Sequence, residues 1–204
     1  MLARVHLALI TAALCVAAAL VGVLVASSHD EGGAAAQVPP GAWAGAVRPP
    51  GARLPAFRLA DQDGRRVTAA TMRGRPAVVA FLYSHCRDTC PSEVQTIRGA
   101  LDELGHDLPV YGISVDPAND TRRSAQAFLL EQKMKGRMRF LLGSRAALAP
   151  LWRAFGIAPQ ARGREHSAYV VLLDARGRQR VGFPFAQLTQ AGLAHDLARL
   201  SESA

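Results

Sequence analysis

The 204-residue sequence predicts an α/β sandwich built on a mixed central sheet. Short apolar runs alternate with amphipathic helical stretches along most of the chain. The two most apolar runs, 77–83 and 108–115, each lead into a helical stretch, as buried parallel strands do. The last two runs are joined by a tight turn and followed by a helix, which indicates an antiparallel hairpin in the same sheet.

The N-terminal segment is apolar enough to cross a membrane. Residues 7–28 carry no charged side chain, and this length is close to that of a bilayer-spanning helix. Arg4 precedes the segment, and Asp30 and Glu31 follow it. The positive-inside rule then places the N-terminus in the cytoplasm and the rest of the chain on the other side. We therefore expect a membrane anchor over residues 1–28.

Secretory signal peptides have shorter apolar cores, so we expect this helix to stay attached, with cleavage after Ala26 or Ser28 as the alternative. A mitochondrial presequence would be amphipathic and rich in Arg. The sequence therefore favours a single-pass protein of a bacterial inner membrane, with its soluble domain in the periplasm. Cys15 lies within the apolar segment and is interpreted as a small apolar residue.

Residues 29–53 are rich in Gly, Ala and Pro and show no apolar periodicity, which predicts an extended linker. The folded domain is predicted over residues 54–204. Its predicted strands span 57–59, 66–68, 77–83, 108–115, 139–142, 167–173 and 179–183. Its predicted helices span 91–104, 121–135, 145–155 and 187–200.

Local signals support these elements in order. The first two strands flank an Asp-Gly turn at Asp63 and Gly64, which is typical of a hairpin. The run 77–83 is continuously apolar, as in a fully buried strand. In the next helix Pro91 suits the first turn, and Glu93 in that turn complements the helix dipole. Gly156 is a typical C-terminal stop for the third helix.

Both cysteines of the soluble part lie between the buried strand and the first helix. Cys90 is placed at the helix N-terminus, where the positive end of the helix favours the thiolate. Side chains four apart on a helix have Cβ atoms about 5–6 Å apart, whereas a disulfide requires about 3.5–4.5 Å. The spacing of Cys86 and Cys90 therefore favours a shared metal ion, and a redox-active pair remains open.

The overall charge is compatible with several kinds of partner. The formal net charge is +8, and it comes mainly from scattered arginines. The sequence contains no dense basic cluster with interleaved aromatic residues and no nucleic-acid motif. We therefore exclude nucleic-acid binding and retain an acidic partner surface.

Four segments together resemble one known family. The segment YSHCRDTCPSEV, residues 83–94, resembles the core motif of the Sco/SenC family of copper-binding proteins, which have a thioredoxin fold. Three further segments agree in order: LPAFRLADQDG at 54–64, SVDPANDT at 114–121 and EHS at 165–167. Arg87 stands where the family commonly has Pro, and Glu165 where it commonly has Asp, but neither change removes a ligand.

The resemblance implies a thioredoxin-like sandwich that binds a copper ion through Cys86, Cys90 and His166. It also implies delivery of copper to the copper-binding subunit of cytochrome c oxidase during assembly. A periplasmic copper donor or thiol reductant would be a further partner. Thiolates suit copper(I), and imidazole serves either oxidation state.

The main alternative is a thiol-disulfide oxidoreductase that uses Cys86 and Cys90 to reduce cysteines of the oxidase subunit. A peroxiredoxin is disfavoured because its threonine position is occupied by Arg87. Structural zinc is disfavoured because a closed zinc site needs four ligands and three are available.

Several neighbouring residues receive structural interpretations. His85 should point away from Cys86 because adjacent residues of a strand end face opposite sides. Met134 and Met138 are expected at a partly buried helix end. Asp120 could support the site by hydrogen bonding, but we favour it as the N-cap of the helix that begins at Thr121.

Overall fold

The computed structural model describes residues 38–39, 41–160 and 168–202. The predicted anchor, residues 1–28, lies outside this part of the chain, and so does the start of the predicted linker. Within the described residues, no helix combines the length and the hydropathy needed to cross a membrane. The described residues belong to one compact unit.

The described strands form one mixed sheet, as the sequence predicts. Its order is β1-β8-β7-β4-β5-β6-β2-β3. Strand β5 pairs in parallel with β4 and β6, and the other neighbouring pairs are antiparallel. The strands are β1 (Ala46–Val47), β2 (Arg58–Asp61), β3 (Arg66–Thr68), β4 (Ala77–Leu82), β5 (Val110–Ser114), β6 (Met138–Leu142), β7 (Tyr169–Leu173) and β8 (Gln179–Pro184).

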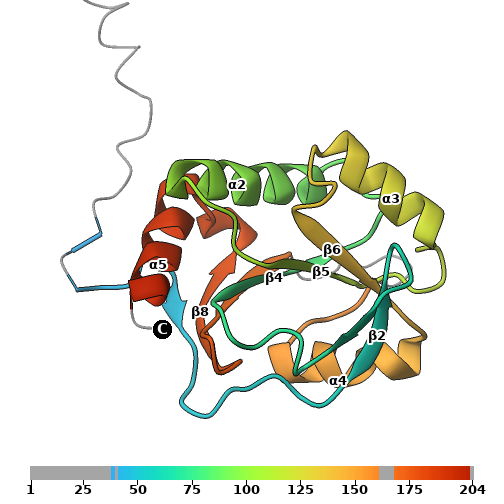
Figure 1. The fold of residues 1–204 in the computed structure, drawn as a ribbon, viewed down its shortest axis with the longest axis horizontal. Helices are drawn as coiled ribbons and strands as arrows, with labels where there is room; N and C mark the ends of the chain where they lie inside the picture. The colour runs from blue at the N-terminus through green and yellow to red at the C-terminus, as the bar shows by residue number, and fades with distance from the viewer. Residues whose placement is uncertain (1–37, 40, 161–167, 203–204) are drawn as a thin grey trace, which may run out of the picture. The chain divides into compact units, whose positions relative to one another are not determined.

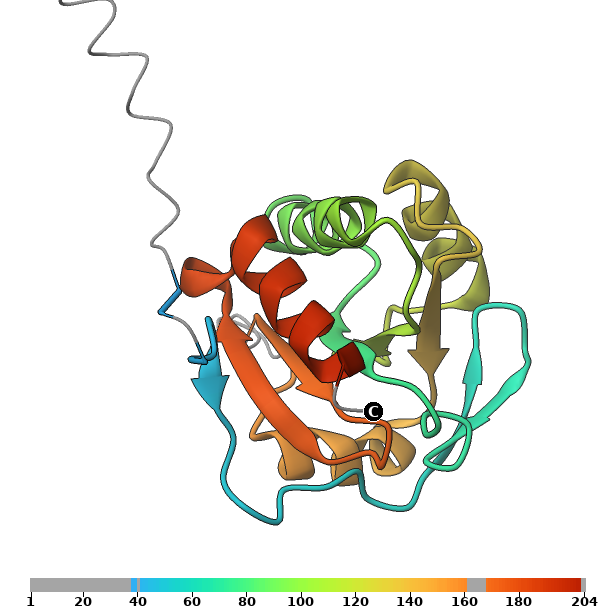
Figure 2. The same ribbon diagram turned by 60° about the vertical axis from the view of Figure 1, so that its left-hand side comes forward.

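Helices cover both faces of this sheet (Figure 1). The helices are α2 (Thr89–Leu104), α3 (Arg122–Glu131), α4 (Arg145–Phe155) and α5 (Gln190–Glu202), with a short 3₁₀ helix η1 (Phe185–Gln187) before α5. Helices α2, α3 and α5 lie on one face and α4 on the other. Figure 2 shows α2 and α5 side by side, in agreement with their contacts.

Strand β4 supplies side chains to both halves of the core. Val78, Ala80 and Leu82 pack on the α2 and α5 side, whereas the alternate residues, Val79 and Phe81 among them, pack on the α4 side. All six residues of the strand are fully buried. Burial on both faces explains why its sequence is continuously apolar rather than alternating.

Two helix boundaries differ from the predicted ones by three residues or more. Helix α3 ends at Glu131, because Gln132 leaves the helical conformation and Lys133 has a φ of 55°. Met134 and Met138 are fully buried core residues, and Met138 belongs to β6 rather than to a helix end. Helix α5 begins only at Gln190, because η1 occupies the start of the predicted helix.

The second half of the predicted linker is part of the fold. Ala46 and Val47 form β1, an edge strand paired with β8. The backbone N–H groups of Ala44 and Gly45 donate hydrogen bonds of 2.9 and 3.0 Å to the buried carboxylate of Asp196 in α5. The fold therefore begins before residue 54. The composition of this segment does not reveal where the fold begins, because the residue that its backbone contacts, Asp196, lies about 150 residues further along the chain.

Candidate functional site

The site is built around the loop that joins β4 to α2. Strand β4 ends at Leu82, and α2 begins at Thr89, so Cys90 lies in the first turn of the helix as the sequence predicts. Cys86 lies in the loop, where its backbone N–H donates to the carbonyl oxygen of Tyr83. The side chains of Cys86 and Cys90 are both buried, and both are thiols.

The environment of Cys86 favours its thiolate. The backbone N–H of Cys90 donates a 3.2 Å hydrogen bond to Sγ of Cys86. Burial opposes a charge on this sulfur and is the largest single influence, but hydrogen bonds from the Cys90 thiol and from the N–H groups of Asp88 and Cys90 outweigh it. The net effect lowers the pKa of Cys86 below its ordinary value.

The pKa of Cys90 is shifted in the opposite direction. Burial raises the pKa of its thiol far above the ordinary value, and the hydrogen bond to Cys86 and the negative charge there raise it further. Cys90 therefore remains protonated while Cys86 ionises. The Cys86 sulfur is therefore available as a thiolate to attack a disulfide or to bind a metal, whereas the Cys90 sulfur must first lose its proton.

Glu93 is a functional candidate that the sequence interpretation missed. It lies in α2 beyond the first turn, with no exposed surface, and so does not complement the helix dipole as predicted. Neither carboxyl oxygen has a hydrogen-bond partner in the described part of the chain. Burial, followed by the negative charge at Cys86, raises the pKa of Glu93 to about 8. Helical periodicity could have found it, since Glu93 shares a face with Cys90 and Ile97.

Asp120 ties the cysteine loop to the neighbouring strand. Its Oδ1 accepts hydrogen bonds of 2.7 Å from both the backbone N–H and the hydroxyl of Ser84, two residues before Cys86. Its Oδ2 accepts a 2.5 Å hydrogen bond from the hydroxyl of Ser114, at the end of β5. The predicted role of Asp120 as an N-cap is wrong, because Thr121 caps α3 through a capping box with Ser124.

The hydrogen bonds of Asp120 support the cysteine loop and do not make Asp120 a metal ligand. Burial raises the pKa of Asp120, and donors from Ser114 and Ser84 counteract that effect in part. The Ser84 hydroxyl also lies 2.8 Å from Oγ of Ser124 in α3. Asp120 therefore fixes where the loop leaves β4. The alternative that the sequence left open, support of the site by hydrogen bonding, is the one that the structure favours.

The histidines divide between described and undescribed parts of the chain. His85 is exposed, and its Nδ1 lies 3.2 Å from the Ser84 hydroxyl rather than near either sulfur. His166 lies outside the described residues. Among the residues that the structure describes, no group of three or more His, Cys, Asp or Glu side chains is placed to hold a metal ion.

The described residues on either side of segment 161–167 lie at the same end of the sheet as the cysteine loop. The backbone N–H of Gln160 donates to the carbonyl oxygen of Val115, directly after β5. Strand β7 runs antiparallel to β4 with Val170 opposite Ala80, so the start of β7 meets the end of β4. The described residues that precede and follow 161–167 therefore lie at the edge of the sheet where the cysteine loop begins.

Known proteins share this fold and sequence pattern. A mitochondrial SCO1 homologue of Arabidopsis thaliana is 31% identical over 121 residues, which cover 56% of this chain and 35% of that protein. The chain thus matches about a third of the length of this curated relative. The copper-bound structure of ScoI from Bradyrhizobium japonicum is 28% identical with a TM-score of 0.59, covering 72% of this chain and 98% of that one.

A third similarity confirms the fold alone. The structure of BsSco, described as having a disulfide switch and as a member of the Sco family of cytochrome c oxidase assembly proteins, is 20% identical with a TM-score of 0.67. The structural match covers 78% of this chain and 99% of BsSco. The thioredoxin-like sandwich is thereby confirmed. The SCO1/SenC family model matches residues 47–202, and the chain therefore belongs to the SCO1/SenC family.

Proposed function

We propose that this protein is a copper chaperone that holds copper through Cys86, Cys90 and His166. It would deliver the metal to the copper-binding subunit of cytochrome c oxidase during assembly. The observation that carries the proposal is the contact between the two cysteines, in which the N–H of Cys90 donates to Sγ of Cys86 at the start of α2. Support also comes from a relative, ScoI of Bradyrhizobium japonicum, whose structure has copper bound.

The donor set fits copper as a transported cargo. Two soft sulfurs favour copper(I), and an imidazole accommodates either oxidation state. Three ligands leave the ion incompletely coordinated, so a ligand of the receiving protein can bind before a donor ligand leaves. Asp120 would keep the loop in place during this exchange, because it holds Ser84 from outside the ligand set.

We infer that His166 is the third ligand from the positions of the described residues on both sides of it. Gln160 and the start of β7, the described residues on either side of 161–167, lie at the carboxyl ends of β5 and β4, from which the cysteine loop also departs. We infer from these two ends that His166 would be within reach of the sulfurs. This supports His166 as the third ligand over His85, whose side chain is exposed and contacts Ser84.

Copper titration of the full-length protein tests the proposal. We expect one copper ion per chain, with thiolate-to-copper absorption, and an affinity at least roughly tenfold weaker in His166→Ala, since one of three ligands is lost. His106→Ala is the matched control, because His106 is exposed just after the end of α2, where its Nδ1 lies 3.2 Å from the Leu104 carbonyl oxygen. Equal affinity and equal spectra in both variants would contradict a ligand role for His166.

We also propose that residues 1–28 anchor the protein in a bacterial inner membrane with the folded unit in the periplasm. The basis is the uncharged segment 7–28 with Arg4 before it and acidic residues after it. Protease added to spheroplasts should degrade the folded unit, whereas a cytoplasmic marker protein should survive. Protection of the folded unit until the membrane is lysed would contradict this orientation.

A second function is favoured by the unequal pKa values of the two cysteines. The Cys86 thiolate can attack a partner disulfide, forming a mixed disulfide and expelling one partner thiolate. Cys90 then gives up its proton and attacks Sγ of Cys86, which expels the second partner sulfur. The chain would end as a disulfide and the partner as a dithiol, a two-electron exchange.

The two functions separate experimentally through His166. Disulfide reduction requires both cysteines but no imidazole ligand. His166→Ala should therefore retain the rate of disulfide reduction if the protein is an oxidoreductase, and bind copper more weakly if it is a chaperone. Support for the second function also comes from BsSco, which is described as having a disulfide switch.

A further inference from the structure

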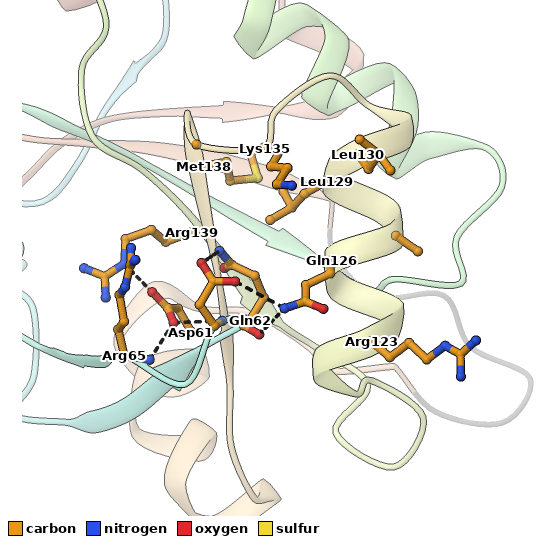
Figure 3. A pocket seen from close by; sticks show the side chains of 13 residues that line it. Asp61, Gln62, Arg65, Arg123, Gln126, Leu129, Leu130, Lys135, Met138 and Arg139 are labelled. Carbon is orange, nitrogen blue, oxygen red and sulfur yellow. Dashed lines mark hydrogen bonds and ion pairs between the residues drawn. The ribbon is translucent and has the colours of Figure 1, made fainter.

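A groove on the α3 side of the molecule lies outside the cysteine site. It has a volume of about 860 Å³ and lies between α3, the turn joining β2 to β3, and the start of β6 (Figure 3). Along α3, Arg123, Gln126, Ala127 and Leu130 line it, and their spacing of three and four residues makes them one stripe of the helix surface. The small side chain of Ala127 leaves room in the middle of this stripe.

The groove combines an apolar floor with an exposed apolar rim. Leu129 and Met138 are fully buried and line its base. Leu130 at the rim is 64% exposed, and among the large apolar side chains of the described chain Val47 and Phe185 are the others that are exposed. An exposed leucine next to a hollow with an apolar floor is typical of a surface that contacts another molecule.

The acidic side chains of the groove are already engaged. The Asp61 carboxylate accepts from Nε of Arg139 at 2.8 Å and from the backbone N–H groups of Asp63 and Arg65. The Asp63 carboxylate accepts from the side-chain amides of Gln62 and Gln126, the latter reaching across from α3. Arg139 therefore compensates the charge of Asp61, whereas Asp63, whose two partners are neutral amides, keeps its negative charge.

Three cations line the groove without an ion pair in the described part of the chain. Arg65, Arg123 and Lys135 are exposed and line the groove, and none forms an ion pair with another described residue. Glu131 is exposed on α3 but does not line the groove. These three cations outnumber the one carboxylate of the groove that lacks a cationic partner, Asp63, so the net charge around the apolar centre is positive.

We propose that this groove binds an acidic segment of a partner protein that carries one large apolar side chain. The apolar side chain packs on Leu130 and the floor, and the carboxylates of the segment pair with Arg65, Arg123 and Lys135. A lipid surface fits less well, because two of the three large apolar side chains that line the groove, Leu129 and Met138, are recessed at its floor and Leu130 alone is exposed at its rim.

The groove also lies close to the cysteine loop at one end. Arg123 is adjacent to Ser124, whose hydroxyl contacts Ser84 at the start of that loop. A partner segment bound along α3 would therefore hold the rest of the partner protein beside the cysteine loop. The proposal does not require copper, since none of the groove residues belongs to the proposed ligand set.

The test measures peptide binding to the full-length chain by fluorescence polarisation. The probes are labelled 12-residue peptides that combine Glu and Asp with one Leu or Phe, and matched peptides with Gln, Asn or Lys in place of the acids. We expect the acidic-apolar peptides to bind and the matched peptides not to bind. Binding should weaken as salt rises, because exposed charge pairs are screened.

Variants locate the binding site. Arg123→Glu combined with Lys135→Glu should weaken binding at least tenfold, and Ala127→Trp should abolish it by filling the groove. Arg176→Glu, a single charge reversal at the exposed turn between β7 and β8, is the control for a charge reversal outside the groove and should leave binding unchanged. Cys86→Ser should also leave it unchanged, which separates this inference from the proposed copper function.

Two results would overturn the proposal. One is that no acidic-apolar peptide binds, or that Arg176→Glu weakens binding as much as the groove variants do. The other is that the groove variants reduce binding to vesicles of phosphatidylcholine and phosphatidylglycerol while peptide binding stays the same. That second pattern would assign the groove to a membrane surface instead.

Discussion

The backbone N–H of Cys90 donates a 3.2 Å hydrogen bond to Sγ of Cys86, so the first turn of α2 stabilises charge on the preceding cysteine rather than on its own. The two thiols consequently have opposite shifts, with the pKa of Cys86 lowered and that of Cys90 raised. The order in which these sulfurs react is therefore a property of the loop, and it can be measured without metal.

Alkylation should distinguish the two cysteines. In the reduced protein at neutral pH, iodoacetamide should modify Cys86 roughly tenfold faster than Cys90 or more, because the thiolate is the reactive form. Cys90→Ala should raise the pKa of Cys86 by removing a hydrogen-bond donor, and Cys90→Ser should restore part of the effect. Mass spectrometry of the modified peptides across pH gives both rates, and equal rates would contradict the assignment.

Asp120 should contribute to stability through the groups that it satisfies. Asp120→Ala leaves the Ser84 N–H and the Ser114 hydroxyl without their acceptor, and we expect a loss of about 1–3 kcal/mol in the free energy of unfolding. Copper affinity should fall as well, since the loop loses its anchor. Urea denaturation measures the first effect and copper titration the second.

Asp116→Ala is the control for this change. Asp116 is half-buried, and its carboxylate accepts from the Asn119 side chain, so its loss should change stability by about 0.5 kcal/mol or less. If both variants lose the same stability, Asp120 has no special role in holding the loop.

Glu93 should make stability depend on pH. The unfolded chain loses the Glu93 proton near its ordinary pKa of 4.5, whereas the folded protein retains it until about pH 8. Because the proton is bound more tightly in the folded state, Glu93 destabilises the fold progressively as pH rises through this window. The protein and Glu93→Gln should have similar stabilities near pH 4.5, and Glu93→Gln should be more stable by a few kcal/mol at pH 8.

Chemical denaturation of both proteins at several pH values measures this difference. Glu93→Asp is a useful comparison, because it keeps a titrating carboxyl at the same position of α2. A stability difference between Glu93→Gln and the unchanged protein that does not vary with pH would show that Glu93 does not titrate across this window.

Local sequence signals were enough to predict the centre of the fold. The continuous apolar run of β4 and the suitability of Pro91 for a first helical turn placed Cys90 at a helix N-terminus, as the structure shows. These elements are specified by neighbouring residues along the chain. The mixed sheet followed from the alternation of strands and helices.

The features that escaped prediction depend on partners distant in sequence. Strand β1 has two residues in a segment of Gly, Ala and Pro, and its pairing with β8 cannot be read from that segment. The role of Asp120 depends on Ser84, which lies 36 residues earlier. The burial of Glu93 runs against the usual exposure of charged residues, although its helical position matched the buried face.

The segment before residue 54 should be required for full stability, in contrast to its predicted role as a linker. The guanidinium carbon of Arg199 lies 4.2 Å from the centroid of the Trp43 ring, and the same guanidinium donates to the Ala42 carbonyl oxygen. Asp196 accepts from the backbone of Ala44 and Gly45. A chain beginning at residue 54 loses all of these contacts and leaves the buried Asp196 carboxylate short of donors. We expect its free energy of unfolding to be lower, by on the order of 3 kcal/mol, than that of a chain beginning at residue 38.

Thermal and urea denaturation of the two chains measures the difference. Asp196→Ala in the longer chain should reproduce part of the loss, because it removes the acceptor while keeping the segment. Equal stability of the two shortened chains would instead support residues 38–53 as a linker that contributes nothing to the fold.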